Sequence, residues 1–239
     1  MRMRKKKNLG PRMERCAAWQ IKEPEALRGN WRSLMPAARE LHVELGCGKG
    51  RFTCLTASAE PDVLFIAVER VPDAMVMAME RARDMELHNV FFVDADAAVL
   101  PTLFAPGEVD RLYINFCDPW PTKRHAKRRL THRGFLLRYR EVLKQEGEIH
   151  FKTDNLPLFE FSLLELPAAG FRLEEVTHDL HGAGVKGIMT DYEEKFHTLG
   201  VRINRCVGVM DALPSPPVPP DTEPAAPTEP QKNEPSLTR

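Results

Sequence analysis

Five short stretches of the chain are almost entirely apolar, and each has the length of a β-strand. They cover residues 41–46, 63–69, 89–96, 111–118 and 147–154. Continuous apolar runs of this length are typical of parallel strands that are buried on both faces. The pattern therefore predicts a parallel sheet at the centre of a domain.

Segments with helical spacing separate these stretches. Residues 72–87 begin with a proline and place apolar side chains at intervals of three and four. In 132–147 the apolar residues between 135 and 143 fall on one face, and Gly147 is placed to end the helix. The alternation predicts a doubly wound α/β fold, in which the ligand lies beyond the carboxyl ends of the strands.

An acidic residue marks the end of every predicted strand. Glu44 comes just before the end of the first strand, and Glu69, Asp96, Asp118 and Asp154 close the other four. Any one of them fits an ordinary solvated strand end. Because parallel strands end at the same edge of a sheet, we expect the whole set to lie along one rim.

A glycine-rich loop, Gly-Cys-Gly-Lys-Gly, follows the first strand at 46–50. Gly46 and Gly48 let the backbone turn tightly and approach a ligand closely. The spacing differs from the GxGxxG pattern of dinucleotide sites, whose pyrophosphate a nearby Glu44 would repel. A carboxylate at that position suits a ligand with a positive amino group.

The acids of the next two strands extend this site. Glu69 is placed to accept hydrogen bonds from two ribose hydroxyls, and Asp96 is placed to accept from an adenine amine. A ligand with an adenine, a ribose, an ammonium and no phosphate is S-adenosylmethionine, whose sulfonium also favours an acidic pocket. The predicted cofactor-binding residues are Glu44, Gly46, Gly48, Glu69, Asp96 and Asp118.

This arrangement resembles the class I methyltransferases. The resemblance implies a Rossmann-like, seven-stranded, mostly parallel sheet with helices on both faces. It also implies a last, antiparallel strand near the end of the domain, for which 200–210 is the candidate.

The string "NFCDPWPTKRHAKRRLTHRGFL", which begins at Asn115, is similar to the signature of bacterial tRNA (guanine-N7)-methyltransferases. The segments "MRMRKK", "HVELGCGKGRF", "DADA", "HFKTDN", "DLH" and "MTDYEEKF" resemble segments of the same family in the same order. The resemblance covers Met1 to about Val209. It implies methyl transfer from S-adenosylmethionine to N7 of a guanosine in the variable loop of tRNA, with Asp118 as the catalytic aspartate.

The chemistry of guanine N7 suits Asp118. N7 carries a free lone pair, so the reaction needs placement of the two reactants rather than a strong base. The purine gains positive charge, which a carboxylate at the guanine edge stabilises. Pro119 and Pro121 stiffen the following peptide, and Trp120 between them either forms a wall of the acceptor pocket or packs in the core.

By the same resemblance, a second group of residues contacts the substrate: Lys123, Asp154, Thr190, Asp191, Tyr192 and Glu193. Thr190 and Glu193 also have the spacing of a helix capping box, and both roles are compatible. The family usually has a lysine where this chain has Thr122. Either that contact is lost, or Lys123 replaces it.

Positive charge is concentrated directly after Asp118, although the chain has 34 basic and 34 acidic side chains in total. A solvated face would explain such a run, but a phosphate backbone would be attracted to it and positioned by it. We expect five residues to line the RNA path: Arg124, His125, Lys127, Arg128 and Arg129. The basic segment 1–7 is either a second RNA contact or disordered.

Composition sets the domain boundaries. Residues 1–40 form a basic arm and a lead-in helical region, and 41–211 form the methyltransferase domain. Residues 212–239 hold nine of the twenty prolines and no aromatic residue, which predicts a disordered tail. Such a tail is solvated or serves as a proline-rich ligand.

The remaining composition favours a cytoplasmic protein. No apolar run is long enough to cross a bilayer, and no secretory signal follows the basic start. The five cysteines have neither CxxC nor zinc spacing, so we expect reduced thiols and no metal. We expect tRNA as the partner, and the protein itself to be a monomer or a homodimer.

Two other functions stay open from the sequence. One is a methyltransferase that acts on another nucleobase or on a small molecule, and the other is a non-catalytic RNA-binding module with a vestigial cofactor pocket.

Overall fold

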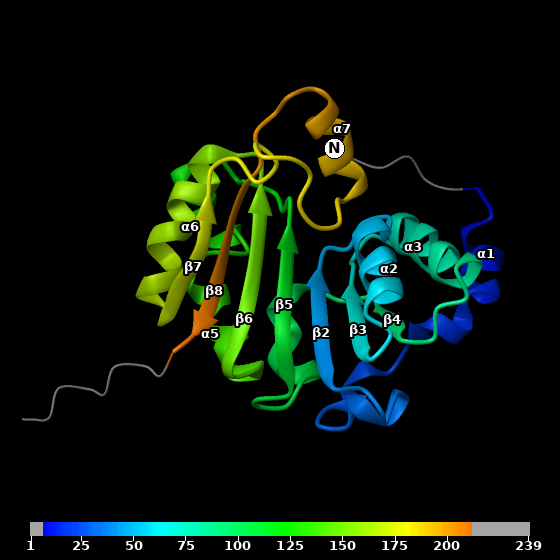
Figure 1. Cartoon of the computed structure of the whole chain (residues 1–239). Coiled ribbons are helices and arrows are strands. Elements are labelled where there is room, and N and C mark those ends of the chain that lie inside the picture. The colour runs from blue at the N-terminus through cyan, green and yellow to red at the C-terminus, as the bar shows by residue number, and fades with distance from the viewer. Residues whose placement is uncertain (1–6, 212–239) are drawn as a thin grey trace, which may run out of the picture.

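The computed structural model describes residues 7–211, so the predicted tail and the first six residues of the basic arm lie outside the described residues. An eight-stranded sheet with the order β1-β4-β3-β2-β5-β6-β8-β7 forms the centre of the molecule (Figure 1). The strands are β1 Gln20–Ile21, β2 Glu40–Leu45, β3 Val63–Val68, β4 Val90–Val93, β5 Val109–Asn115, β6 Leu143–Thr153, β7 Phe171–Thr177 and β8 Asn204–Met210.

The sheet confirms the predicted class I methyltransferase topology. Neighbouring strands from β1 to β6 pair in parallel. Only β8, within the segment predicted to be antiparallel, pairs antiparallel with β6 and β7. The sheet has one strand more than predicted, because the two-residue β1 adds to the edge beside β4.

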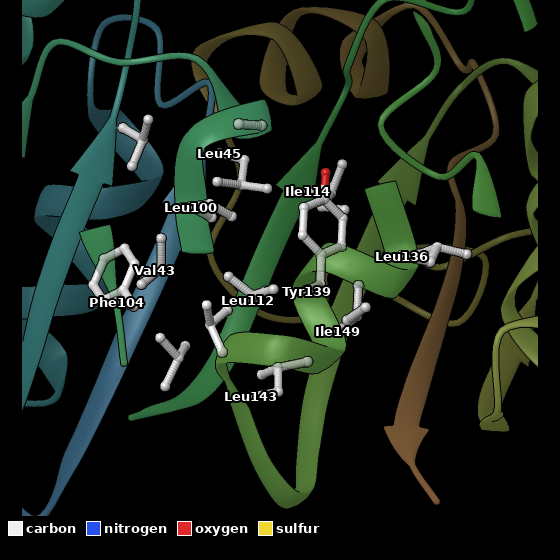
Figure 2. Close-up of a cluster of buried hydrophobic side chains, with 14 of the residues drawn as sticks. Val43, Leu45, Leu100, Phe104, Leu112, Ile114, Leu136, Tyr139, Leu143 and Ile149 are labelled. Atoms are coloured by element: carbon white, nitrogen blue, oxygen red, sulfur yellow. The ribbon is translucent and has the colours of Figure 1, made fainter. Parts of the chain in front are cut away.

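Helices cover both faces of the sheet, as predicted. They are α1 Leu9–Arg15, α2 Arg51–Ala59, α3 Pro72–Asp84, α4 Leu100–Leu103, α5 Arg133–Val142, α6 Leu156–Ala168 and α7 Asp191–Thr198. On one face of the sheet, buried side chains of α4, α5 and α6 pack against those of β2, β5 and β6 (Figure 2). Tyr139 of α5, Val43 of β2 and Leu112 of β5 belong to this cluster. A second cluster joins α2 and α3 to the opposite face, where Phe65 and Met75 are buried.

The helix predicted over 132–147 is too long at its carboxyl end. Helix α5 ends at Val142, and Leu143 opens strand β6 instead of a last helical turn. Leu143 pairs with Val109 of β5 and is only 2% exposed. Strand pairing and burial override the local helical pattern there, so the prediction that Gly147 ends the helix is wrong.

The prediction that every strand is buried on both faces is also wrong for β6. Ile149 and Phe151 are fully buried, whereas the alternate residues Glu148 and His150 are partly exposed. Helices α2 and α3 lie over β3 and β4, and in the described part of the chain no helix continues this layer over β6 (Figure 1). The uncovered face therefore alternates apolar and polar residues, as a half-solvated sheet does.

Candidate active site

A pocket of about 600 Å³ lies at the carboxyl ends of β2, β3, β4 and β5. Four of the predicted cofactor residues line it: Gly46, Glu69, Asp96 and Asp118. They reach the pocket from four neighbouring strands because parallel strands end at the same edge. The sequence also missed residues that line it, among them Arg70, Asn115 and Phe116.

Positive backbone φ angles and a backbone hydrogen bond to Glu69 define the shape of the glycine loop. Gly46 and Gly48 have positive φ angles of 75° and 57°, and Gly50, at the start of α2, has a φ of 74°. The Gly48 N–H donates to Glu69 Oε2 at 2.9 Å. A Cβ on Gly50 would lie 2.5 Å from the Cβ of Ala78, so only glycine lets α2 approach α3 this closely.

Two acids of the pocket are oriented by backbone donors. Glu69 is 8% exposed, and its Oε1 accepts from the Val71 N–H at 2.9 Å. Asp96 is exposed, its Oδ1 accepts from the Ala98 N–H at 2.9 Å, and its Oδ2 pairs with Arg70 at 3.1 Å. Both carboxylates therefore have a fixed position beside open space.

Glu44 lies beneath this pocket and does not line it. It is 2% exposed, and burial raises the pKa of its carboxyl group above the ordinary value. The Thr53 hydroxyl donates to one oxygen, and Asn115 Nδ2 donates to the other at 2.9 Å. The predicted cofactor contact of Glu44 stays a prediction; in this structure its side chain is almost completely buried.

Asp118 stands three residues after the end of β5, on an exposed turn. Phe116 and Trp120 flank it with positive φ angles of 52° and 40°, which turn the chain sharply on both sides. The Phe116 N–H donates to the Lys152 carbonyl at 2.9 Å, which ties this turn to β6. No hydrogen bond or ion pair to Asp118 occurs within residues 7–211, so its carboxylate is free to meet a substrate.

Trp120 lines the pocket, as one of its two predicted roles requires. The guanidinium of Arg128 lies 4.8 Å from the centre of its ring, and the ring of His125 meets it edge-on at 5.8 Å. The indole therefore joins the turn of Asp118 to the basic segment Lys123–Arg128, a 3₁₀ helix.

Helix α7 brings the predicted substrate residues near this turn. Thr190 and Glu193 form the capping box that the sequence predicts. The Tyr192 hydroxyl donates to Asp154 Oδ2 at 3.1 Å, and the Tyr192 ring centre lies 5.2 Å from that of Phe116. Thus Asp154 and Tyr192 approach the Asp118 turn from β6 and α7. Asp191 points elsewhere and pairs with Arg81 at 3.4 Å.

Glu193 is fully buried and anchors α7 to the sheet. Its Oε2 accepts from Lys152 Nζ at 2.6 Å, and its Oε1 lies 3.0 Å from His181 Nε2. Burial lowers the pKa of Lys152, while the charge of Glu193 opposes that shift. Substrate contact by Glu193 stays a prediction; its side chain has no exposed surface, and its ion pair with Lys152 anchors α7 to β6.

The predicted RNA-binding residues, together with the predicted substrate residue Lys123, divide into two groups. Lys123, Arg124, Lys127 and Arg128 are exposed, and no acidic side chain in the described part of the chain pairs with them. Arg129 instead donates to the carbonyls of Pro119 and Trp120, both at 3.0 Å, and lies 4.4 Å from the ring centre of Phe161.

Arg129 therefore stabilises the Asp118 turn through its backbone carbonyls.

His125 Nδ1 lies 3.0 Å from the Thr122 hydroxyl. Lys123, the next residue after Thr122, is exposed.

Within the described ranges, no cluster of three or more His, Cys, Asp or Glu side chains has the arrangement of a metal site. The five cysteines are free thiols. Among the helices of residues 7–211, none combines the length and apolar character of a membrane span.

The sequence matches the family model of a putative methyltransferase over residues 38–206. A tRNA (guanine-N(7)-)-methyltransferase of Geobacillus thermodenitrificans is 45% identical over 207 residues, which are 86% of this chain and 96% of the relative. The protein of that name from Halalkalibacterium halodurans is 48% identical over 187 residues, 78% of this chain and 85% of the relative.

Solved structures share the fold at low sequence identity. The 16S rRNA methyltransferase KamB has a TM-score of 0.61 at 16% identity, covering 77% of this chain and 94% of that one. An antibiotic-related methyltransferase has a TM-score of 0.58 at 21% identity, covering 76% and 92%. The pocket, the family model and the close relatives agree, and this chain belongs to the tRNA (guanine-N7)-methyltransferase family.

Proposed function

We propose that this protein transfers a methyl group from S-adenosylmethionine to N7 of a guanosine in the variable loop of tRNA. The observation that carries the proposal is Asp118, which has no partner among residues 7–211, shares one rim with Glu69 and Asp96, and stands beside exposed cations that no acid of the same range pairs with. The names of the relatives support the same reaction. A tRNA substrate also implies a cytoplasmic protein, which we expect to be a monomer or homodimer.

The chemistry of the pocket residues fits S-adenosylmethionine, which supplies an electrophilic methyl group on a sulfonium when bound. Glu69 offers a fixed carboxylate to the ribose hydroxyls, and Asp96 offers one to the adenine amine. Gly46 lines the pocket and, because it has no side chain, lets the ligand approach the backbone closely. No pyrophosphate-binding pattern competes with this assignment.

Asp118 has the properties that attack by guanine N7 requires. Its carboxylate is exposed at the pocket rim and, within residues 7–211, makes no hydrogen bond or ion pair that a substrate would have to break. It accepts hydrogen bonds from the N–H groups of the guanine edge and so places N7 toward the pocket. It then stabilises the positive charge that the purine gains. Trp120 and Phe116 form apolar walls on either side.

The basic segment supplies the attraction for RNA. Lys123, Arg124, Lys127 and Arg128 are free to contact phosphates, which positions the polyanion without reading its bases. Lys127 and Arg128 also line the pocket, so a bound backbone would pass directly beside Asp118. The target guanosine lies in the folded body of a tRNA, so the base must turn out of its stack before it reaches the pocket.

The test is tritiated methyl transfer into bulk tRNA, followed by mapping of the labelled base. We expect the label in 7-methylguanosine of the variable loop. Label in another base would support the alternative methyltransferase. Binding of tRNA without binding of S-adenosylmethionine would support a non-catalytic module.

A further inference from the structure

Helix α7 lies at the end of the molecule toward which β5 and β6 point (Figure 1). It has only eight residues, and glycines with positive φ angles precede and follow it, at Gly187 and Gly200. An added Cβ at either glycine would meet no atom within 4 Å, so neither position is fixed by packing. Because so short a helix is not stable alone, contacts with other elements decide where α7 lies.

Strand β6 holds the first turn of α7 through two contacts. Lys152 pairs with Glu193 at 2.6 Å, and the Tyr192 hydroxyl donates to Asp154 at 3.1 Å. Two contacts from one strand define an axis, and they do not fix the rotation of the helix about that axis. The orientation of α7 therefore depends on further contacts.

Two arginines of the cofactor half supply these contacts. Arg51, the first residue of α2, directly follows the glycine loop, and its Nη1 and Nη2 donate to the two carboxylate oxygens of Glu194, Nη2 at 2.8 Å. Arg81 of α3 pairs with Asp191 at 3.4 Å. A bidentate pair of arginine and carboxylate fixes direction as well as distance. These pairs therefore attach α7 to α2 and α3 in addition to β6.

The orientation of α7 determines the place of one aromatic ring. The Tyr192 ring stacks on that of Phe196 of the same helix at 4.2 Å, so the two rings move with the helix. The Tyr192 ring centre also lies 5.2 Å from that of Phe116, which lines the pocket two residues before Asp118. A rotation of α7 would therefore change the surface beside Asp118.

We propose that Arg51 and Arg81 are positioning residues for methyl transfer. By pairing with Glu194 and Asp191, they orient α7 so that Tyr192 borders the site of the acceptor base. This assignment rests on the proposed function, because it presumes a base placed beside the Asp118 turn. Neither arginine lines the cofactor pocket, and both guanidinium groups already bind carboxylates. They act through α7 and touch neither the cofactor nor the tRNA.

A positioning role has effects that differ from those of a stabilising or an RNA-binding role. Partly exposed ion pairs add little to stability. A misplacement of reacting groups by about 1 Å, in contrast, lowers a reaction rate about a hundredfold. Loss of these pairs should therefore slow the reaction and leave the stability and the affinities unchanged.

The experiment uses Arg51→Gln, Arg81→Gln and the combined variant. In the combined variant we expect the rate of single-turnover methyl transfer to tRNA to fall about tenfold or more. The melting temperature should stay within about 2 °C of the original. Filter binding of tRNA and calorimetric binding of S-adenosylhomocysteine should not change. A parallel loss of tRNA affinity would place the arginines on the RNA path and overturn the assignment, and so would an unchanged rate.

Arg83→Gln is the matched control. Arg83 lies two residues from Arg81 on α3, its side chain is 34% exposed against 33%, and it pairs with Asp84. It should keep the full rate, and an equal loss in Arg83→Gln would trace the effect to α3 alone and defeat the assignment. If the unchanged protein transfers no methyl group to tRNA, the proposed function fails. If all variants are as fast as the unchanged protein, only this assignment fails.

The three tyrosines of the chain allow a measurement that needs no activity. Tyr113 and Tyr139 are buried, whereas Tyr192 is 42% exposed. In protein labelled with 3-fluorotyrosine, the ¹⁹F resonance of Tyr192, identified by its loss in Tyr192→Phe, should move in Arg51→Gln and in Arg81→Gln. It should stay in place in Arg83→Gln. A Tyr192 resonance that moves in neither of the first two variants would show that the arginines do not orient α7.

Discussion

Asp118 differs from the other acids of the pocket because no partner in the described part of the chain holds it. Glu69 and Asp96 each accept a backbone N–H, whereas Asp118 stands exposed between two turns of positive φ. An unpaired carboxylate contributes little to stability. Its position is therefore better explained by a role toward a substrate.

Replacement of Asp118 by Asn should separate activity from stability. We expect the rate of methyl transfer to fall about 100-fold or more, because the charge beside the purine is lost. The melting temperature should stay within about 2 °C of the original, since the side chain is exposed and unpaired. The measurements are single-turnover methyl transfer and calorimetric unfolding.

Asp84→Asn serves as the control for that change. Asp84 is exposed, and its one ion pair in the described part of the chain is with its neighbour Arg83 at the end of α3. It should retain full activity. Near-normal turnover of Asp118→Asn would remove the carboxylate from the mechanism.

At the scale of elements, the contact between α2 and α3 depends on Gly50. Replacement by Ala would place a Cβ 2.5 Å from Ala78 Cβ at a φ of 74°. We expect Gly50→Ala to lower the free energy of unfolding by about 2–4 kcal/mol, from overpacking and from the left-handed backbone. Urea unfolding measures it.

Gly48→Ala isolates the backbone contribution to that loss. Gly48 has a φ of 57° and no atom within 4 Å of its added Cβ. It should cost only about 1 kcal/mol. Equal losses in the two variants would show that the approach of α2 to α3 does not matter.

The attachment of α7 depends on the buried pair of Lys152 and Glu193. Glu193→Gln leaves the Lys152 ammonium buried without a counter-charge, and we expect a loss of about 3 kcal/mol in the free energy of unfolding. The double variant Lys152→Met with Glu193→Gln should lose less than the sum of the two single changes. Thermal and urea unfolding of the two single variants and the double variant give the double-mutant cycle.

Glu194→Gln is the neighbouring control. Glu194 pairs with Arg51 and its side chain is 46% exposed, so its loss should cost no more than about 1 kcal/mol. If Glu193→Gln were as mild as Glu194→Gln, α7 would not depend on the buried pair. A loss of substrate affinity in Glu193→Gln at unchanged stability would instead favour substrate contact.

At the scale of the whole molecule, the exposed cations beside the pocket should govern tRNA affinity. If about four or five of them neutralise phosphates, the logarithm of the association constant should fall against the logarithm of salt concentration with a slope of about −3 to −5. Arg124→Glu should reduce the magnitude of that slope by about 1 and leave S-adenosylhomocysteine binding unchanged, because Arg124 is exposed and does not line the pocket. Filter binding over a salt series measures both slopes.

Arg39→Glu is the control for long-range charge. Arg39 precedes β2, at the opposite edge of the sheet from the pocket. It should leave the slope nearly unchanged. A slope near zero in the original protein would remove a phosphate backbone from the mechanism.

The buried His42 should make stability depend on pH. Burial lowers the pKa of His42 from 6.5 to about 4. Between these two pH values the imidazole is therefore protonated in the unfolded chain and neutral in the folded protein. Stability should therefore be fully present above pH 6.5 and decline as the pH falls from 6.5 to 4, by about 3 kcal/mol. His42→Gln should flatten this decline in urea unfolding. The exposed His178→Gln should not, and an equally steep decline in His42→Gln would assign the effect to other groups.

Local patterns in the sequence predicted the sheet, the glycine loop and the acids at the strand ends, because periodicity and strand ends are properties of neighbouring residues. The capping box of α7 was predictable for the same reason. The end of α5 was not, because Leu143 joins β6 through pairing with Val109. The helical pattern of the α5 sequence continues beyond Val142, whereas strand pairing with β5 already begins at Leu143.

The tertiary structure alone decided which of the predicted site residues remain free to bind. Glu44 is covered by Asn115 from 71 positions away, and Glu193 is neutralised by Lys152 from 41 positions away. The sequence determined the kinds of side chain at the rim of the sheet and thereby the chemistry of the pocket. Burial depends on contacts between distant segments, so only the fold decided that Asp118 is exposed beside the pocket while Glu44 and Glu193 are buried.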